Sequence, residues 1–225
     1  SGFATHAVVD RASAVPVGDD IPADVAAVLG CAVLTGGGAV LNAARPGPQD
    51  SVMIVGLGGV GMAALITAIS QGVSRIVAVD TLEEKLEHAR RLGAHETYTP
   101  QQVLEEGVKA RYVIECAGNP RAFETAFAAT AAGGTTITAG LPHPDARAQI
   151  SPLTVTAEAR TIVGSYLGSA VPSRDIPKYA RLWREGKLPV EELISSRIAL
   201  SDINQAMDQL ADGKAVRQVI MFDAG

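Results

Sequence analysis

The sequence predicts an α/β protein built on a doubly wound parallel sheet. Short β-rich runs alternate with helical patterns from residue 51 onward, and a glycine-rich turn joins the first run to the first helical pattern. Alternation of this kind is typical of an open sheet covered by helices on both faces. With 225 residues, of which 47% are hydrophobic, the chain is long enough to bury a core without disulfides or structural metals.

The first strand is expected over residues 51–55 and the first helix of the sheet region over 60–69. Both are apolar on every side, which is typical of elements buried in a parallel sheet. A second strand is expected over 75–79. The helix after Asp80 has apolar residues at helical spacing and charged residues between them, and Gly93 is its expected end.

The same reasoning places the remaining elements. Further strands of the sheet are expected over 111–116, 135–139 and 161–164, with a helix over 121–131. The flanking segments are expected to hold two short strands within residues 1–20, one or two helices over 22–44, a helix over 173–186 with a serine cap, a strand over 195–200, a helix over 202–211 and a final strand over 217–222.

Composition excludes several functional classes. A net charge of −5 argues against a nucleic-acid partner, which needs a concentrated positive field. The two cysteines are separated by 84 residues, which indicates no disulfide framework and suits a cytoplasmic location. Residues 25–44 and 51–74 lack charge over a membrane-spanning length. Their glycine clusters and polar side chains nevertheless favour a protein that does not contact a membrane, and no signal peptide is expected.

The motif G-L-G-G-V-G at Gly56–Gly61 lies between the first strand and its helix. In a Rossmann-type dinucleotide site, the first glycine allows a tight turn and the second lets the backbone approach a pyrophosphate. The third lets the helix pack closely on the strand. The helix N-terminus then presents free N–H groups to the phosphates. We therefore predict a cofactor loop of Gly56, Leu57, Gly58, Gly59, Val60 and Gly61.

Asp80 follows Gly61 by 19 residues and comes directly after the second strand. A carboxylate there accepts hydrogen bonds from the adenosine ribose and repels a 2′-phosphate, so NAD is favoured over NADP. Lys85 is within reach of the same ribose. Two other interpretations are weaker: a glycine turn that only packs a helix on a sheet, and a methyltransferase, which carries an acid before its glycines.

Short-chain dehydrogenase chemistry needs a lysine four residues after a tyrosine, and none of the four tyrosines has one. The sequence instead resembles the zinc-dependent medium-chain alcohol dehydrogenases. The resemblance rests on G-C-A-V-L-T-G-G-G-A-V from Gly30, on the glycine loop with V-A-V-D, on Glu115, on D-I-P-K from Asp175 and on the closing V-R-Q-V-I-M-F. The resemblance extends over essentially the whole of this chain. It matches only the C-terminal portion of the family's sequences: the end of the catalytic domain, the cofactor domain and the C-terminal segment.

The resemblance implies three segments and a set of site residues. Residues 1–45 would be the end of a mainly β catalytic domain, 46–166 the Rossmann NAD-binding domain, and 167–225 a segment returning to the catalytic domain. Cys31 would be a thiolate ligand of the catalytic zinc. Thr35 would lie beside the nicotinamide, Asp80 and Lys85 at the ribose, and Arg217 at the pyrophosphate. The cofactor groove would be lined by Cys116, Ala117, Ala139 and Leu141.

The residues alone leave several of these roles open. A lone cysteine such as Cys31 is more often a small buried side chain than a metal ligand. Cys116 ends a core strand, and its position predicts a packing role only. The four histidines are scattered and are expected to face solvent. Arg217 could equally be an ordinary surface charge.

A catalytic zinc needs three protein ligands, and the resemblance identifies only one in these residues. We therefore expect the isolated chain to bind NAD(H), with no catalytic residue of its own and no oxidation of an alcohol or aldehyde substrate. Two alternatives remain: a stand-alone NAD(H)-binding module and a zinc-free medium-chain reductase. A homodimer or tetramer is expected through an edge strand at Ala148–Ile150. The apolar faces of residues 1–45 and 187–225 are expected to be exposed, mobile or covered by another chain.

Overall fold

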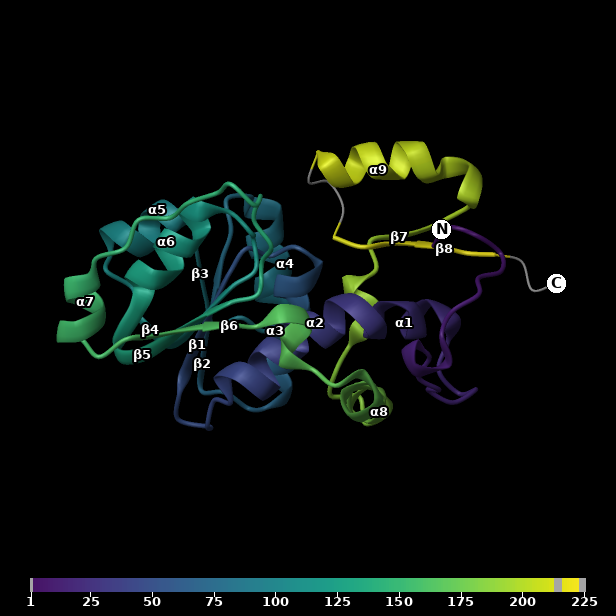
Figure 1. Ribbon diagram of the computed structural model, residues 1–225, viewed down its shortest axis with the longest axis horizontal. Helices are drawn as coiled ribbons and strands as arrows, with labels where there is room; N and C mark the ends of the chain where they lie inside the picture. Colours follow the sequence, from purple (N-terminus) through teal and green to yellow (C-terminus); the bar gives the residue numbers. More distant parts are fainter. Residues whose placement is uncertain (1, 213–215, 223–225) are drawn as a thin grey trace.

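The computed structural model describes residues 2–212 and 216–222 and contains a six-stranded parallel sheet at one end of the molecule (Figure 1). The strand order is β3-β2-β1-β4-β5-β6, with β1 in the interior of the sheet. The strands are β1 (Ser51–Val55), β2 (Arg75–Val79), β3 (Glu96–Tyr98), β4 (Ala110–Glu115), β5 (Thr130–Thr138) and β6 (Thr161–Gly164). This order reverses direction between β1 and β4, and ligands bind at the carboxyl ends of strands at such a point. The predicted fold class is confirmed.

Alternate residues of the strands pack into two separate cores. Val52 and Ile54 of β1 face the first core, which includes α3 (Gly59–Ser70) and α4 (Glu83–Leu92). Met53 and Val55 face the second core, which includes the apolar faces of α5 (Pro100–Glu105) and α6 (Pro120–Ala129). The uninterrupted apolar character of β1 therefore follows from burial on both faces of the sheet.

Residues 23–44 form one long helix made of consecutive segments. It comprises α1 (Ala23–Val28), the π-helical η2 (Leu29–Val33), α2 (Leu34–Gly38) and the π-helical η3 (Ala39–Ala44). Among the described residues, one helix is long and apolar enough to cross a bilayer by length and composition, and it is this one. Within its most apolar stretch, 72% is buried inside the protein. Its apolar residues belong to the first core, so its composition has an explanation within the fold.

The three adjacent glycines of this helix, Gly36–Gly38, do not interrupt it, and each of the three takes a close contact. A Cβ on Gly36 would lie 2.1 Å from the carbonyl oxygen of Val60 in α3. A Cβ on Gly37 would lie 2.7 Å from the ring of Tyr179, and one on Gly38 2.3 Å from the carbonyl oxygen of Gly168. The glycine cluster is thus the surface on which three other parts of the chain approach the helix.

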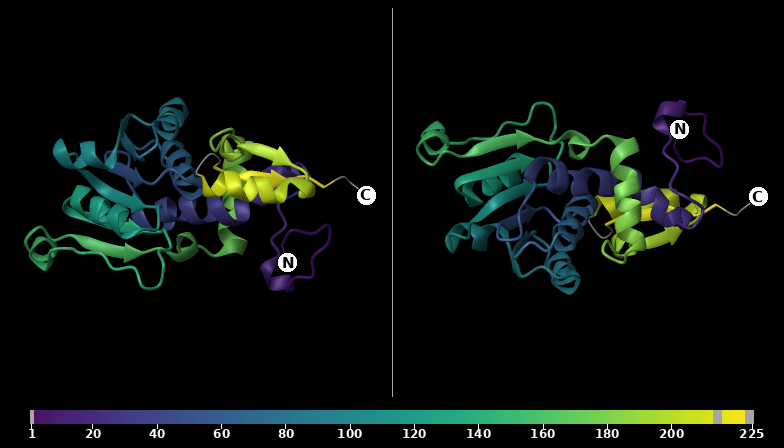
Figure 2. Two further views of the ribbon diagram at one scale, coloured as in Figure 1. Left: turned by 90° about the horizontal axis from the view of Figure 1, so that it is seen from above. Right: turned by 90° about the horizontal axis from the view of Figure 1, so that it is seen from below.

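The C-terminal part of the chain packs around the long helix and ends in a small second sheet. Figure 2 shows the paired strands at the end of the molecule away from the large sheet. Strands β7 and β8 are parallel, with Ser196 opposite Gln218. The elements are η4 (Tyr166–Ser169), α8 (Pro172–Arg184), η5 (Val190–Leu193), β7 (Ser196–Ile198), η6 (Leu200–Asp202), α9 (Ile203–Ala211) and β8 (Gln218–Ile220). Helix α7 (Pro152–Ala157) lies far from them, at the outer end of the large sheet (Figure 1).

Three expectations about the flanks are wrong in part. Residues 2–20 form no strand; they contain only the short turn η1 (Arg11–Ser13) and are mostly exposed, since no neighbouring strand accepts their backbone hydrogen bonds. Helix α8 begins at Pro172 without a side-chain cap, so Ser173 is not its cap. Exposed apolar faces occur at Val8, Val9 and in α9, but the long helix is buried.

The expected edge strand at Ala148–Ile150 is also wrong for this chain. The segment has no strand conformation, and the backbone N–H of Gln149 donates to the carboxylate of Glu124 instead of to a strand. The edge of the sheet is β6, which pairs with β5 only. The elements β3, α5 and α7 were not predicted.

Candidate functional site

The Gly56–Gly61 loop has the geometry that its sequence predicts. Gly56 has φ +91°, and its backbone N–H donates to the carbonyl oxygen of Val79 at 2.8 Å. A Cβ on Gly61 would lie 1.8 Å from the carbonyl oxygen of Gly56, so the helix approaches the strand as closely as glycine allows. A Cβ on Gly58 would meet no atom within 4 Å. The loop therefore leaves space outside Gly58 at the N-terminus of α3.

Asp80 holds the glycine loop through a hydrogen bond to its backbone. Its carboxylate is 9% exposed and accepts hydrogen bonds from the backbone N–H of Leu57 at 2.7 Å and of Leu82 at 3.0 Å. The Nζ of Lys85 lies 4.0 Å from the same carboxylate. Asp80 thus fixes both the glycine loop and the start of α4, a role that sequence reasoning missed.

Arg217 brings the C-terminal segment to the loop. A Cβ on Gly59 would lie 3.1 Å from its Nη2 atom. The Nε of Arg217 is buried without a hydrogen-bond partner in the described structure. A buried donor without a partner is uncommon and calls for a physical explanation. Arg217 therefore lies beside the glycine loop, and its expected role at a pyrophosphate stays a prediction.

Glu115 at the end of β4 fixes the opposite wall of the site. The side chain is 1% exposed, and its Oε1 accepts from the backbone N–H of Ala117 at 2.7 Å and of Gly118 at 2.6 Å. Its Oε2 accepts from the hydroxyl of Thr138 at 3.1 Å. One carboxylate thus ties together the turns after β4 and β5. Its place after a buried strand was a signal for this role, although it was absent from the predicted site.

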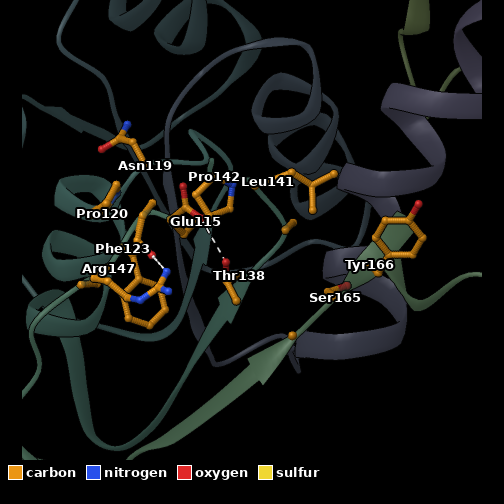
Figure 3. Close-up of a pocket in the computed structure, with 15 residues that line it drawn as sticks. Glu115, Asn119, Pro120, Phe123, Thr138, Leu141, Pro142, Arg147, Ser165 and Tyr166 are labelled. Carbon is orange, nitrogen blue, oxygen red and sulfur yellow. Dashed lines mark hydrogen bonds between the residues drawn. The ribbon is translucent and has the colours of Figure 1, made fainter. Parts of the chain in front are cut away.

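Two cavities are lined by residues at and after the end of β4. The first, of about 290 Å³, is lined by residues that include Gly56, Asp80 and Ala117. The second, of about 620 Å³, is lined by residues that include Ala139 and Leu141. Figure 3 shows the hydrogen bond from Thr138 to Glu115 in the second cavity, with Tyr166 on the side of the long helix.

Several other predicted site residues lie outside the linings of these two cavities. Cys116 is half-buried, and desolvation of its thiol raises the thiol pKa above the ordinary range, which suits packing. Thr35 is buried in the long helix beside η4. Neither these two nor Lys85 lines either of the two cavities. Cys31 is exposed on the long helix.

The described residues do not provide a zinc site. No group of three or more His, Cys, Asp or Glu side chains comes together among them in a way that could hold a metal ion. A catalytic zinc requires three protein ligands. Cys31 alone therefore does not fit a bound zinc within this part of the chain.

Comparisons with known proteins find alcohol dehydrogenases among the relatives of this chain. Geraniol dehydrogenase of Castellaniella defragrans is 35% identical over 230 residues, a match that includes 99% of this chain and 61% of that protein. Alcohol dehydrogenase 1 of Pisum sativum is 32% identical over 233 residues with the same two shares. A crystal structure of benzyl alcohol dehydrogenase from Acinetobacter calcoaceticus superimposes with a TM-score of 0.86 at 31% identity, with 92% of this chain and 59% of that chain covered.

The chain thus spans about three fifths of the length of these relatives. The family model described as zinc-binding dehydrogenase matches residues 59–185, which is more than half of the chain. The match includes the helix that starts in the glycine loop, Asp80 and Glu115. The chain belongs to the zinc-binding dehydrogenase family.

Proposed function

We propose that this chain binds NAD(H) with the pyrophosphate over the Gly56–Gly61 loop. The observation that carries the proposal is the pairing of open space at Gly58 with the buried, partnerless Nε of Arg217 beside Gly59. A pyrophosphate in that space would accept a charge-assisted hydrogen bond from the guanidinium. The N-terminus of α3 adds free N–H groups and the positive end of a helix dipole.

The two cavities would take the two halves of the dinucleotide. Asp80 borders the 290 Å³ cavity, and its oxygens retain the capacity to accept from ribose hydroxyls in addition to the backbone. The nicotinamide half would extend toward the 620 Å³ cavity at the ends of β5 and β6. The carboxylate would disfavour a 2′-phosphate, so NAD is proposed over NADP.

In a complete protein, we propose that this portion serves alcohol dehydrogenation. NAD, when bound, accepts or returns a hydride at its nicotinamide ring. The residues of this chain would bind and orient the cofactor, with 46–166 as the binding domain and 1–45 and 167–225 as parts of a catalytic domain. No step is assigned to zinc, because Cys31 has no companion ligands among the described residues. Assembly as a homodimer or tetramer and a cytoplasmic location belong to the same proposal.

Titration calorimetry with NADH and NADPH tests the binding proposal. We expect saturable NADH binding and affinity for NADPH at least about tenfold lower, a difference of about 1.4 kcal/mol. Arg217→Gln should weaken NADH binding by about tenfold or more, since it removes the charged donor. Arg181→Gln, on an exposed arginine of α8, is the matched control and should bind as the unmodified chain does. Equal binding by the two variants would contradict the assignment of Arg217.

A turnover assay separates the proposed reaction from a binding module. The purified 225-residue chain is assayed with NAD, a set of primary alcohols and added zinc. We expect no reduction of NAD, because the ligand set for zinc is incomplete in the described residues. Zinc-dependent turnover by this chain would overturn that part of the proposal and leave the NAD site intact.

A further inference from the structure

Residues 167–169 form a turn whose backbone is left-handed at every position. The φ angles are +46° at Leu167, +70° at Gly168 and +49° at Ser169. Side chains other than glycine rarely adopt this conformation, and consecutive examples persist only where the surroundings impose them. The residues immediately before the turn, Ser165 and Tyr166, line the 620 Å³ cavity. The turn therefore determines the shape of one wall of that cavity.

Two polar residues outside the cavity hold this turn. The side-chain amide of Asn42 donates to the carbonyl oxygen of Gly168 at 3.1 Å and to the carboxylate of Asp175 at 3.3 Å. Asp175 is 3% exposed and accepts from the backbone N–H of Val171 at 2.9 Å. Asn42 and Asp175 lie on the long helix and on α8, so the turn is anchored to both.

The turn packs closely on the long helix at Gly168. A Cβ on Gly168 would lie 2.3 Å from the carbonyl oxygen of Leu34 and 2.7 Å from that of Thr35. The turn thus sits directly on the helical segment α2. Arg174 completes the anchor by donating to both oxygens of Asp175 at 2.7 Å, and this pairing holds the pKa of Asp175 below its ordinary value.

We propose that Asn42 and Asp175 are positioning residues for the nicotinamide half of the cofactor. The inference rests on the proposed NAD(H) site. A dinucleotide bound across the β1–β4 switch point has its adenosine half beside Asp80, so its other half extends over the ends of β5 and β6. The clamp formed by Asn42 and Asp175 sets the wall that this second half meets. It acts through the turn and has no contact with the adenosine side.

The test compares two ligands that share the adenosine half. NADH contains the nicotinamide ring, whereas ADP-ribose lacks it. Asn42→Ala should weaken NADH binding by about fivefold or more, leave ADP-ribose binding within twofold of the unmodified chain, and reduce the fluorescence enhancement of bound NADH. Asn204→Ala, on an exposed helical asparagine, is the matched control and should change none of these. Thermal unfolding of each variant verifies that it is folded.

Asp175→Asn provides a second variant that retains the shape of the side chain. It should show the same selective loss to a smaller degree, because an amide oxygen still accepts from Val171 while the ion pair with Arg174 is lost. The positioning role is overturned if either folded variant weakens the binding of NADH and of ADP-ribose equally. It is also overturned if either folded variant leaves the binding of both ligands unchanged. If the unmodified chain binds ADP-ribose and NADH equally, the clamp has no nicotinamide to position and is overturned as well. If it binds neither ligand, the proposed NAD(H) site itself fails.

Discussion

At the scale of single residues, the glycines of the loop have two different physical roles. Gly61 is required by the protein, because a side chain there would collide with the backbone of Gly56 at 1.8 Å. Gly58 is not required by the protein, since its φ of −76° suits any residue and no atom lies near its Cβ position. The same motif therefore contains one glycine that serves folding and one that serves a ligand.

This difference leads to a paired prediction. Gly61→Ala should lower the free energy of unfolding by about 1–3 kcal/mol, the usual cost of forcing extra volume into a packed site. Gly58→Ala should leave the unfolding free energy nearly unchanged and weaken NADH binding by about tenfold or more, since a methyl group would occupy the space for the pyrophosphate. Urea unfolding and calorimetry on both variants measure the two effects. A stable Gly61→Ala variant would contradict the geometry of the loop.

Glu115 supports a second prediction at this scale. Glu115→Met replaces the carboxylate by an apolar side chain of similar length, so the backbone N–H groups of Ala117 and Gly118 lose their acceptor. We expect the free energy of unfolding to fall by about 1–3 kcal/mol, the cost of leaving buried donors without acceptors. The control is Glu84→Met on the exposed face of α4, which should change stability by less than about 0.5 kcal/mol. Equal effects of the two changes would contradict the role given to Glu115.

At the scale of elements, the long helix resolves an alternative that the sequence left open. One or two helices were expected over residues 22–44, and residues 23–44 form one helix in spite of three adjacent glycines. The glycines are the positions where α3, Tyr179 and Gly168 come closest. The capping box at Thr99 and Gln102, by contrast, was a local signal for α5 that could have predicted this helix.

The helix supports a further paired prediction. Gly38→Ala should destabilise the protein, because its Cβ would lie 2.3 Å from the carbonyl oxygen of Gly168. Gly30→Ala has no atom within 4 Å of its Cβ and should stabilise the protein by about 0.5–1 kcal/mol through better helix propensity. Thermal unfolding of both variants measures the difference. The two substitutions are expected to change the stability in opposite directions. A change in the same direction for both would contradict the packing of the helix.

At the scale of the whole molecule, ion pairs lower the pKa values of carboxylates in different parts of the structure. Arg197 of β7 holds the pKa of Asp24 in α1 below its ordinary value, and Arg75 does the same for Glu96. The pKa of Asp175 is lowered by its neighbour Arg174. The first pair joins the C-terminal segment to the long helix, the second links β2 to β3 of the large sheet, and the third lies within α8, so protonation of these carboxylates affects stability in each of these parts.

The predicted pH dependence follows from the direction of these shifts. In the unfolded chain the carboxylates regain ordinary pKa values of about 4, so the unfolded state takes up protons first as the pH falls. The stabilisation is complete above those values and is lost as the pH falls through the lower folded pKa values. Urea unfolding at a series of pH values should show this loss, and Glu96→Gln should reduce the slope. An unchanged slope would contradict the role of the Arg75–Glu96 pair.

Local pattern was sufficient for most strands of the sheet and for the glycine loop, although β5 begins at Thr130, five residues before its expected start. Continuous apolar runs require burial on both faces, and β1, β2 and β4 are found within a residue of their expected bounds. The short strand β3 and helix α7 gave too little periodicity to be predicted. The strands expected within residues 1–20 failed because a strand needs a partner, and alternating apolar residues do not specify one.

The sequence by itself determined the fold class, the glycine loop and the acid that follows β2, because each depends on residues close together in the chain. Only the tertiary structure decided that Asp80 supports Leu57, that Arg217 meets Gly59, and that Asn42 meets Asp175 across 133 positions. The physical reason is that burial and periodicity are local properties of a sequence. The partner of a buried polar group is settled by how distant elements pack, and no local pattern contains that information.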